Sequence, residues 1–184
     1  IAQEHSFINA QKHDSQDICF VPDGDYARFM EDFTGRHYPA GDFLDENCRV
    51  VGTHNGAVRY TIGQRKGLGI GGRKESLFIL ATDTVQNVIY VGEGDSHPGL
   101  WRQALHIAPR EIHWVNPART MPAGQSARFS VRIRYRQPLQ EATLFVRDQG
   151  AYILFDTPQR GITPGQFAAW YDGDELVGSG VISE

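Results

Sequence analysis

The 184-residue sequence is poor in cysteine: it contains only Cys19 and Cys48, which lie 29 positions apart. Two cysteines at that separation make neither a disulfide framework nor a zinc-ligand cluster, so we expect no metal site. No apolar run is long enough to span a bilayer, so we expect no membrane association. Free thiols fit a reducing compartment, and the expected location is therefore the cytoplasm.

Lysine is missing from the second half of the chain. Residues 101–184 contain nine Arg, no Lys and eight acidic residues, whereas residues 1–100 contain nine Lys and Arg against fourteen acidic residues. The net charge of −4 argues weakly against a nucleic-acid partner. The all-arginine second half points the other way, because guanidinium suits bidentate phosphate recognition and stacking on bases.

The arginines are concentrated in residues 127–136, where every second residue from Phe129 onward is apolar or aromatic. This alternation predicts a strand with one buried face. At about 3.3 Å per residue, the opposite face carries a basic stripe roughly 26 Å long, which would suit a phosphate backbone. The stripe consists of Arg128, Arg132, Arg134 and Arg136. The alternative is a solvated face paired with cross-strand acids such as Glu141.

The remaining patterns predict a mainly β protein with a small α component. Apolar spacing predicts a helix over residues 25–33, ended by Gly35. The expected strands are residues 50–51, 60–62, 77–82 and 88–91, with a turn at Asn55-Gly56, then the hairpins 142–147 with 152–155 and 167–171 with 176–182. Hairpins at this spacing are typical of a small closed barrel or sandwich. Residues 94–99, rich in Gly, Pro, Ser and Asp, predict a boundary between domains 1–98 and 99–184.

Gly67, Gly69 and Gly72 match the spacing G-x-G-x-x-G of dinucleotide-binding proteins. That site requires a helix after the glycines, whereas residues 77–81 read as a strand, so we reject it. Arg65 and Lys66 stand beside these flexible glycines, where they could hold a phosphate or guide a loop.

Cys19 has acidic and turn-forming neighbours on both sides, which predicts a loop over about residues 13–24. Nucleophilic sulfur chemistry requires such access. The alternative is a small hydrophobic residue packed beneath Ile18 and Phe20.

Several motifs together resemble the tRNA-specific 2-thiouridylase family. They are Asp14-Ser15-Gln16-Asp17-Ile18-Cys19-Phe20, His54-Asn55-Gly56 running into residues 60–70, Arg134-Tyr135-Arg136-Gln137, and Thr163-Pro164-Gly165-Gln166 followed by residues 171–174. They occur in the family's order and cover nearly the whole chain. The resemblance implies a small mixed α/β central domain followed by a translation-factor-like β-barrel.

The resemblance also implies ATP-dependent transfer of sulfur to C2 of the wobble uridine (position 34) of tRNA. Cys19 matches the cysteine that carries the persulfide, Arg134 and Tyr135 match a tRNA-contacting pair, and Gln166 matches a further tRNA contact. Arg128, Arg132 and Arg136 are added as tRNA contacts on the strand pattern alone. Because Arg134 and Tyr135 are adjacent, we expect either that the strand ends or bulges before Pro138, or that only one of them makes the main contact.

The family's N-terminal ATP-pyrophosphatase domain finds no match in this sequence, and Cys48 matches none of the family's catalytic positions. We therefore expect that the chain binds no cofactor itself, that ATP with Mg²⁺ is used by that other domain, and that the chain is inactive alone. The expected partners are tRNA and a persulfide-donating protein, but not DNA. Two alternatives stay open: a non-catalytic RNA-binding barrel, and a sulfur carrier that does not touch RNA.

Overall fold

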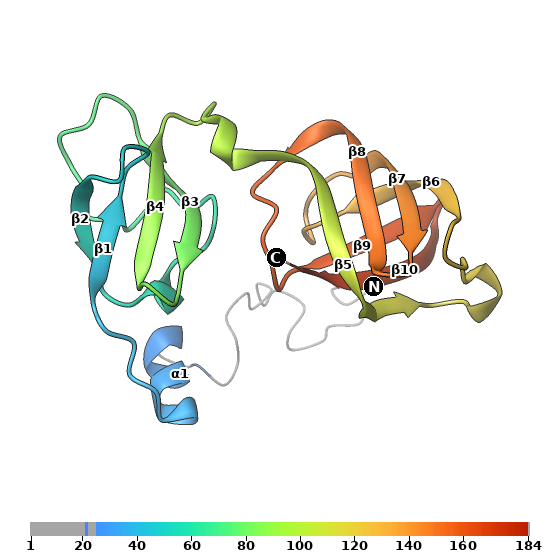
Figure 1. Ribbon diagram of the computed structural model, residues 1–184, viewed down its shortest axis with the longest axis horizontal. Helices are drawn as coiled ribbons and strands as arrows, with labels where there is room; N and C mark the ends of the chain where they lie inside the picture. The colour runs from blue at the N-terminus through green and yellow to red at the C-terminus, as the bar shows by residue number, and fades with distance from the viewer. Residues whose placement is uncertain (1–20, 22–24, 184) are drawn as a thin grey trace, which may run out of the picture. The chain divides into compact units, whose positions relative to one another are not determined.

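The computed structural model describes residue 21 and residues 25–183 (Figure 1). Cys19 and most of its expected loop lie outside the described residues. The chain divides into two compact units, with the division between Pro39 and Ala40. In the described part of the chain, no helix has the length and apolar character needed to cross a membrane.

The first unit contains helix α1 (Tyr26–Thr34), which confirms the helix predicted over residues 25–33. Asp25 caps its start, because the carboxylate accepts a hydrogen bond from the Arg28 N–H at 3.0 Å. Gly35 ends it in the left-handed conformation at φ 65°, which is the conformation that glycine adopts most readily.

In the second unit, a four-stranded sheet has the order β2-β1-β4-β3 (Figure 1). Its strands are β1 (Gly41–Leu44), β2 (Val50–His54), β3 (Leu77–Asp83) and β4 (Val88–Glu93). β1 and β4 are parallel, and the other neighbours are antiparallel. Phe43, Ile79 and Ile89 are fully buried and form the centre of its core.

The sequence predicted three of these four strands. β1 was missed, and the strand expected at residues 60–62 is wrong. Asn55-Gly56 leads instead into a short 3-10 helix, η1 (Ala57–Arg59). Tyr60 then packs its ring edge-on against Phe43, with the ring centroids 5.3 Å apart. The aromatic character that suggested a strand therefore reflects core packing.

His54 is the fully buried polar residue of this sheet. Its Nδ1 accepts a hydrogen bond from the Gly56 N–H at 3.2 Å, so the ring proton is on Nε2, which lies 3.1 Å from the Asn87 carbonyl oxygen. The imidazole thus joins the end of β2 to the turn before β4. Its contacts are structural and leave no ring nitrogen for chemistry.

The turn between β1 and β2 is organised by Asp45. Its carboxylate accepts hydrogen bonds from the N–H groups of Asn47 and Arg49 at 2.9 and 3.0 Å. The backbone hydrogen bond from Arg49 is the main cause that lowers the pKa of Asp45. Cys48 is exposed in this turn and has a φ of 58°.

The second group of strands forms a closed, antiparallel barrel in the order β10-β5-β8-β7-β6-β9 (Figure 1). The strands are β5 (Trp101–Trp114), β6 (Ser126–Arg132), β7 (Gln140–Arg147), β8 (Gly150–Arg160), β9 (Phe167–Asp172) and β10 (Glu175–Ile182). The short 3-10 helices η2 (Pro98–Leu100) and η3 (Pro117–Arg119) flank β5. The barrel and the mixed sheet with one helix confirm the predicted fold class.

Trp170 fills the barrel interior and is fully buried. Gly178 on β10 makes room for it, since a Cβ at that position would lie 2.5 Å from the indole. The indole of Trp114 packs edge-on against Trp170, with the ring centroids 5.6 Å apart. Alternating residues of the strands supply the rest of the core, including Ile107, Leu144 and Ile153.

Replacing His54 with Ala removes a buried ring together with its hydrogen bonds to the Gly56 N–H and the Asn87 carbonyl. We expect a loss of about 3 kcal/mol in the free energy of unfolding, measured by urea denaturation. The matched control is Val85→Ala in the exposed β3–β4 turn, which should change stability by less than about 0.5 kcal/mol. Equal effects of the two substitutions would contradict the structural role of His54.

Asp45→Asn should reduce the acid dependence of stability. Because the pKa of Asp45 is lowered on folding, its contribution is complete above the ordinary carboxyl pKa of 3.8 and is lost as the pH falls through the folded-state pKa. The variant should therefore be less stable than the parent at neutral pH, and the two should converge in strong acid. The control is Asp42→Asn on the neighbouring strand. A difference in stability between the variant and the parent that stays constant across the acid range would contradict the role given to Asp45.

Candidate nucleic-acid interface

The expected arginine strand ends at Arg132, so the prediction of a regular strand through Arg136 is wrong. The cause is the side chain of Gln137, whose Oε1 accepts the Ile133 N–H at 3.1 Å, a position that a sheet partner would otherwise take. The Gln137 N–H in turn donates to the Arg134 carbonyl at 3.1 Å and closes a turn. The adjacency of Arg134 and Tyr135 is therefore resolved by the end of the strand.

The turn presents its polar side chains to solvent. Tyr135 is 87% exposed, which is unusual for an aromatic ring. Arg134 is also exposed, and its Nη2 donates to the Gly161 carbonyl at 2.6 Å. Gly161 has φ 63°, and a Cβ there would lie 2.5 Å from the Arg134 Nη2, so glycine is needed at this contact. The guanidinium is thus held in one place although it is exposed.

Gln166 reaches the same place from a distant part of the sequence. Its N–H donates to the Thr163 carbonyl at 3.3 Å, and its carbonyl accepts the Ile182 N–H at 2.8 Å, which fixes the entry to β9. A hollow of about 670 Å³ is lined by side chains of both segments. They are Arg132, Arg134, Tyr135, Gln166, Phe167 and Tyr171. We call this hollow the Tyr135 hollow.

Two aromatic members of the Tyr135 hollow were not found from the sequence. Phe167 is 63% exposed at the start of β9, and Tyr171 lies on the same outward face of that strand. The alternation of residues along this strand could have identified them. The buried residues Ala168 and Trp170 alternate with outward-facing residues, which are Phe167, Ala169 and Tyr171. An exposed and a half-buried aromatic residue on the solvent side of a strand favour a binding surface over a merely solvated one.

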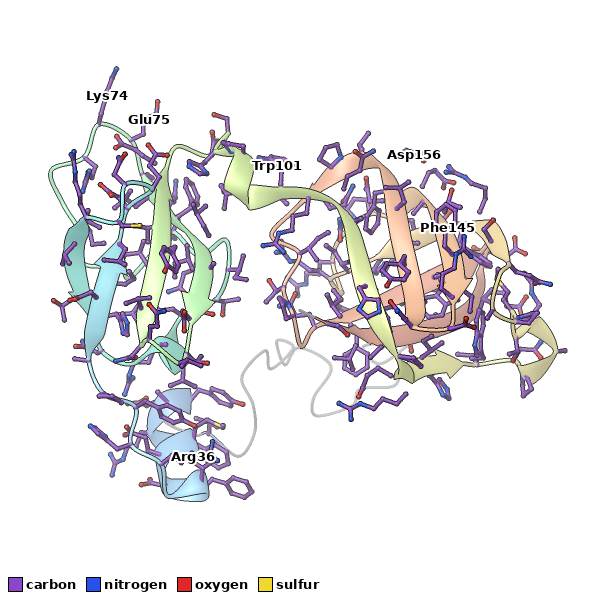
Figure 2. The ribbon with its side chains drawn as sticks, in the orientation of Figure 1. Arg36, Lys74, Glu75, Trp101, Phe145 and Asp156 are labelled. Atoms are coloured by element: carbon purple, nitrogen blue, oxygen red, sulfur yellow. The ribbon has the colours of Figure 1, made fainter. Side chains whose placement is uncertain are left out.

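The arginines do not form one continuous stripe. Arg128 binds Asp156 through two hydrogen bonds of 2.6 Å and lies 3.7 Å from Glu141 (Asp156 is labelled in Figure 2). The hydrogen bond to Asp156 raises the pKa of Arg128 and lowers that of Asp156. Arg128 therefore fits the alternative given for the arginine strand, in which an arginine on a solvated face pairs with acidic residues of neighbouring strands, including Glu141.

Arg132 faces the Tyr135 hollow instead. Its Nη1 donates to the Tyr135 carbonyl at 3.1 Å, and its guanidinium carbon lies 5.7 Å from the centroid of the Tyr171 ring. No acidic residue lines this hollow among the described residues. Arg132 and Arg134 therefore supply positive charge beside exposed rings, whereas the charge of Arg128 is neutralised by Asp156.

Arg65 and Lys66 line a separate hollow of about 960 Å³ together with Arg73 and Lys74. Glu75 and Asp95 also line it, so its charge is mixed (Lys74 and Glu75 are labelled in Figure 2). The loop is anchored where the Gly63 N–H donates to the Ile79 carbonyl and the Gln64 carbonyl accepts the Ile79 N–H. β3 follows the glycines, as expected when the dinucleotide motif was rejected.

Among residues 25–183, no three His, Cys, Asp or Glu side chains lie close enough together to hold a metal ion. The Tyr135 hollow instead brings together cationic, aromatic and amide groups. Such a combination suits nucleic acid, because guanidinium groups bind phosphates and aromatic rings stack on bases.

Two family models match the chain. Residues 27–93 match the family described as tRNA methyl transferase PRC-barrel domain, and residues 105–182 match the family described as Aminomethyltransferase beta-barrel domain. The two matches cover the mixed sheet and the closed barrel.

Full-length relatives give the family. The chain is 42% identical to the tRNA-specific 2-thiouridylase MnmA of Christiangramia forsetii over 100% of the chain and 54% of the relative. It is 42% identical to the protein of that name from Pseudomonas aeruginosa over 99% of the chain and 48% of the relative. The chain spans about half the length of the curated relatives it matches. On these grounds it belongs to the tRNA-specific 2-thiouridylase family.

Proposed function

We propose that this chain is the tRNA-docking and sulfur-carrying portion of a tRNA 2-thiouridylase. The observation that carries the proposal is the convergence of Arg134, Tyr135 and Gln166 on the Tyr135 hollow. The resemblance selected these three residues, and Gln166 lies on a different strand connection from the other two. Their meeting at one surface supports a shared ligand.

The chemistry of the hollow fits RNA. Arg132 and Arg134 supply two guanidinium groups for phosphate oxygens, and Tyr135, Phe167 and Tyr171 supply ring faces on which unpaired bases could stack. Gln166 offers an amide that can both donate and accept a hydrogen bond. Shape and backbone contacts would select the tRNA, with Arg128 excluded because Asp156 occupies it.

The sulfur step is assigned to Cys19. In this proposal, ATP activates the C2 oxygen of the wobble uridine, and the terminal sulfur of a Cys19 persulfide attacks C2 and displaces that oxygen with the adenylate. That attack leaves the transferred sulfur bonded to both C2 and the Cys19 Sγ. The thiolate of a second cysteine of the complete enzyme then attacks the Cys19 Sγ, which breaks this S–S bond, leaves the sulfur on C2 and forms a disulfide with Cys19. ATP with Mg²⁺, the second cysteine and the docking of the sulfur-donor protein belong to the complete enzyme, so the isolated chain should not thiolate tRNA.

The docking proposal is tested by salt dependence. Arg132→Ala combined with Arg134→Ala should weaken tRNA binding and lower the slope of log K against log salt by roughly one unit for each phosphate that the variant no longer neutralises. The control is Arg110→Ala, an exposed arginine of β5 that lies beside Glu111. A double variant whose salt slope equals that of the parent would contradict the proposed docking surface. Removal of the Arg110 side chain should change neither the affinity nor the slope appreciably.

The sulfur proposal is tested in the full-length protein. Cys19→Ala should abolish 2-thiouridine formation, measured by nucleoside mass spectrometry, while tRNA affinity changes less than about twofold. Cys48→Ala is the matched control, because Cys48 is the exposed cysteine of the β1–β2 turn and should leave thiolation intact. Full activity of the Cys19 variant would favour a non-catalytic RNA-binding barrel. Persulfide on Cys19 without RNA affinity would favour a sulfur carrier.

A further inference from the structure

A second hollow lies beside the Tyr135 hollow, and Arg134 lines both. It has a volume of about 500 Å³ and lies among the ends of β5 and β8 and the turn after β6. Arginines and glutamines line it, and no acidic residue does so among the described residues. They are Arg134, Arg136, Arg160, Gln137, Gln140 and Gln159. We call it the Trp101 hollow, after the indole at its edge. The motif Arg134-Tyr135-Arg136-Gln137 contains three of these residues, but neither the resemblance nor the arginine pattern showed that they meet Arg160.

The glutamines of the Trp101 hollow are held in place by one another. Gln159 is only 5% exposed, and its Oε1 accepts a hydrogen bond from the Gln137 Nε2 at 2.8 Å. Its own Nε2 donates to the Thr157 carbonyl at 2.8 Å. The Nε2 of Gln140 donates to the Pro138 carbonyl at 3.1 Å. Since an amide nitrogen has two hydrogens and an amide oxygen two lone pairs, the network keeps donors and acceptors for a ligand.

Arg160, at the end of β8, lines both the Trp101 hollow and the mixed-charge hollow of Arg65 and Lys66, and it has unused donors. Its Nε and Nη2 are buried and have no hydrogen-bond partner among the described residues. The guanidinium carbon lies 4.7 Å from the centroid of the Phe78 ring, a contact with the flat face that leaves the N–H groups at the edge unpaired. Buried donors of a charged group are costly unless they are satisfied, so this guanidinium calls for an anionic or strongly accepting ligand.

Trp101 supplies an apolar ring that lines the same hollow. Its side chain at the start of β5 is labelled in Figure 2. Trp101 pairs with Arg160 across β5 and β8 and is 43% exposed. The other two tryptophans, Trp114 and Trp170, pack in the barrel core. An exposed indole beside three guanidinium groups is a platform for a flat, polar ring that is attached to an anionic group.

We propose that the Trp101 hollow binds one unpaired nucleotide of an RNA, with its base stacked on Trp101 and its phosphate held by Arg160. Gln137 and Gln140 would meet the polar edge of the base. This inference rests on the proposed function for the source of the RNA, but it names a different set of side chains. With Arg134 between the two hollows, the surface would hold neighbouring nucleotides of one unpaired strand.

The test uses the fluorescence of Trp101, the tryptophan outside the core. Titrating the full chain with tRNA, or with a short unstructured oligouridylate, should quench the emission, and Trp101→Phe should remove most of that quenching while keeping affinity within about threefold. Trp101→Ala should weaken binding by about 5- to 100-fold, the range expected when one base stack is removed. Val115→Ala, which truncates an exposed residue directly after the same strand, should have no effect.

The role of the Arg160 charge is tested with Arg160→Gln, which should weaken RNA binding and lower the salt slope by about one unit. Urea denaturation is the control that the variant is folded. Unchanged affinity of both the Trp101→Ala and Arg160→Gln variants would overturn the inference. Quenching by polyglutamate but not by RNA would also overturn it and would indicate an acidic protein partner. Trp101-dependent binding of oligouridylate without tRNA binding would sustain the inference and reject the proposed function.

Discussion

Closure of the barrel is the constraint on which the rest of the binding surface depends. β6 pairs with β7 on one side over residues 126–131 and with β9 on the other over residues 130–132. Beyond Arg132 the strand has no further sheet partners, and the side chain of Gln137 takes over the Ile133 N–H. The chain therefore leaves the barrel wall and turns, which projects Arg134 and Tyr135 outward. Six strands around Trp170 thus decide where the exposed groups stand.

The turn after β6 is held by polar contacts in addition to the buried side chain of Ile133. Gln137 hydrogen-bonds to the buried Gln159 of β8, and Arg134 hydrogen-bonds to the Gly161 carbonyl just beyond it. Both contacts tie the turn to the same strand end, so the two hollows share one framework. A buried amide that lacks a hydrogen-bond partner raises the free energy of the folded protein. Buried amide pairs of this kind therefore favour the one geometry in which every group is satisfied.

Ion pairing divides the arginines of the barrel into two kinds. Arg128 is bound by Asp156 and Glu141, and Arg119 is bound by Asp172 and Glu175. Arg132, Arg134 and Arg160 make no ion pair within the described residues and line the hollows. The net charge of the second half of the sequence is small, but its arginines are not all neutralised: some are paired with acids, and others line the Tyr135 and Trp101 hollows, which no acidic side chain of the described residues lines. Acids neutralise the arginines that stabilise strand pairing and leave positive charge where the exposed aromatic rings lie.

The sequence by itself determined the fold class, the helix after Asp25, both C-terminal hairpins and the family, because periodicity and turn residues act locally and the motifs are specific. It also selected Arg134, Tyr135 and Gln166 by resemblance. The strand predicted at residues 60–62 was wrong, because the aromatic ring of Tyr60 packs against Phe43 in the core and does not belong to a strand. The predicted strand over residues 127–136 was too long, because β6 ends at Arg132. Only the tertiary structure decided which arginines are neutralised and that Trp101 and Arg160 share a hollow with Gln137 and Gln159. The physical reason is that pairing partners such as Arg128 and Asp156 lie far apart in the chain, and strand register, not local pattern, brings them together.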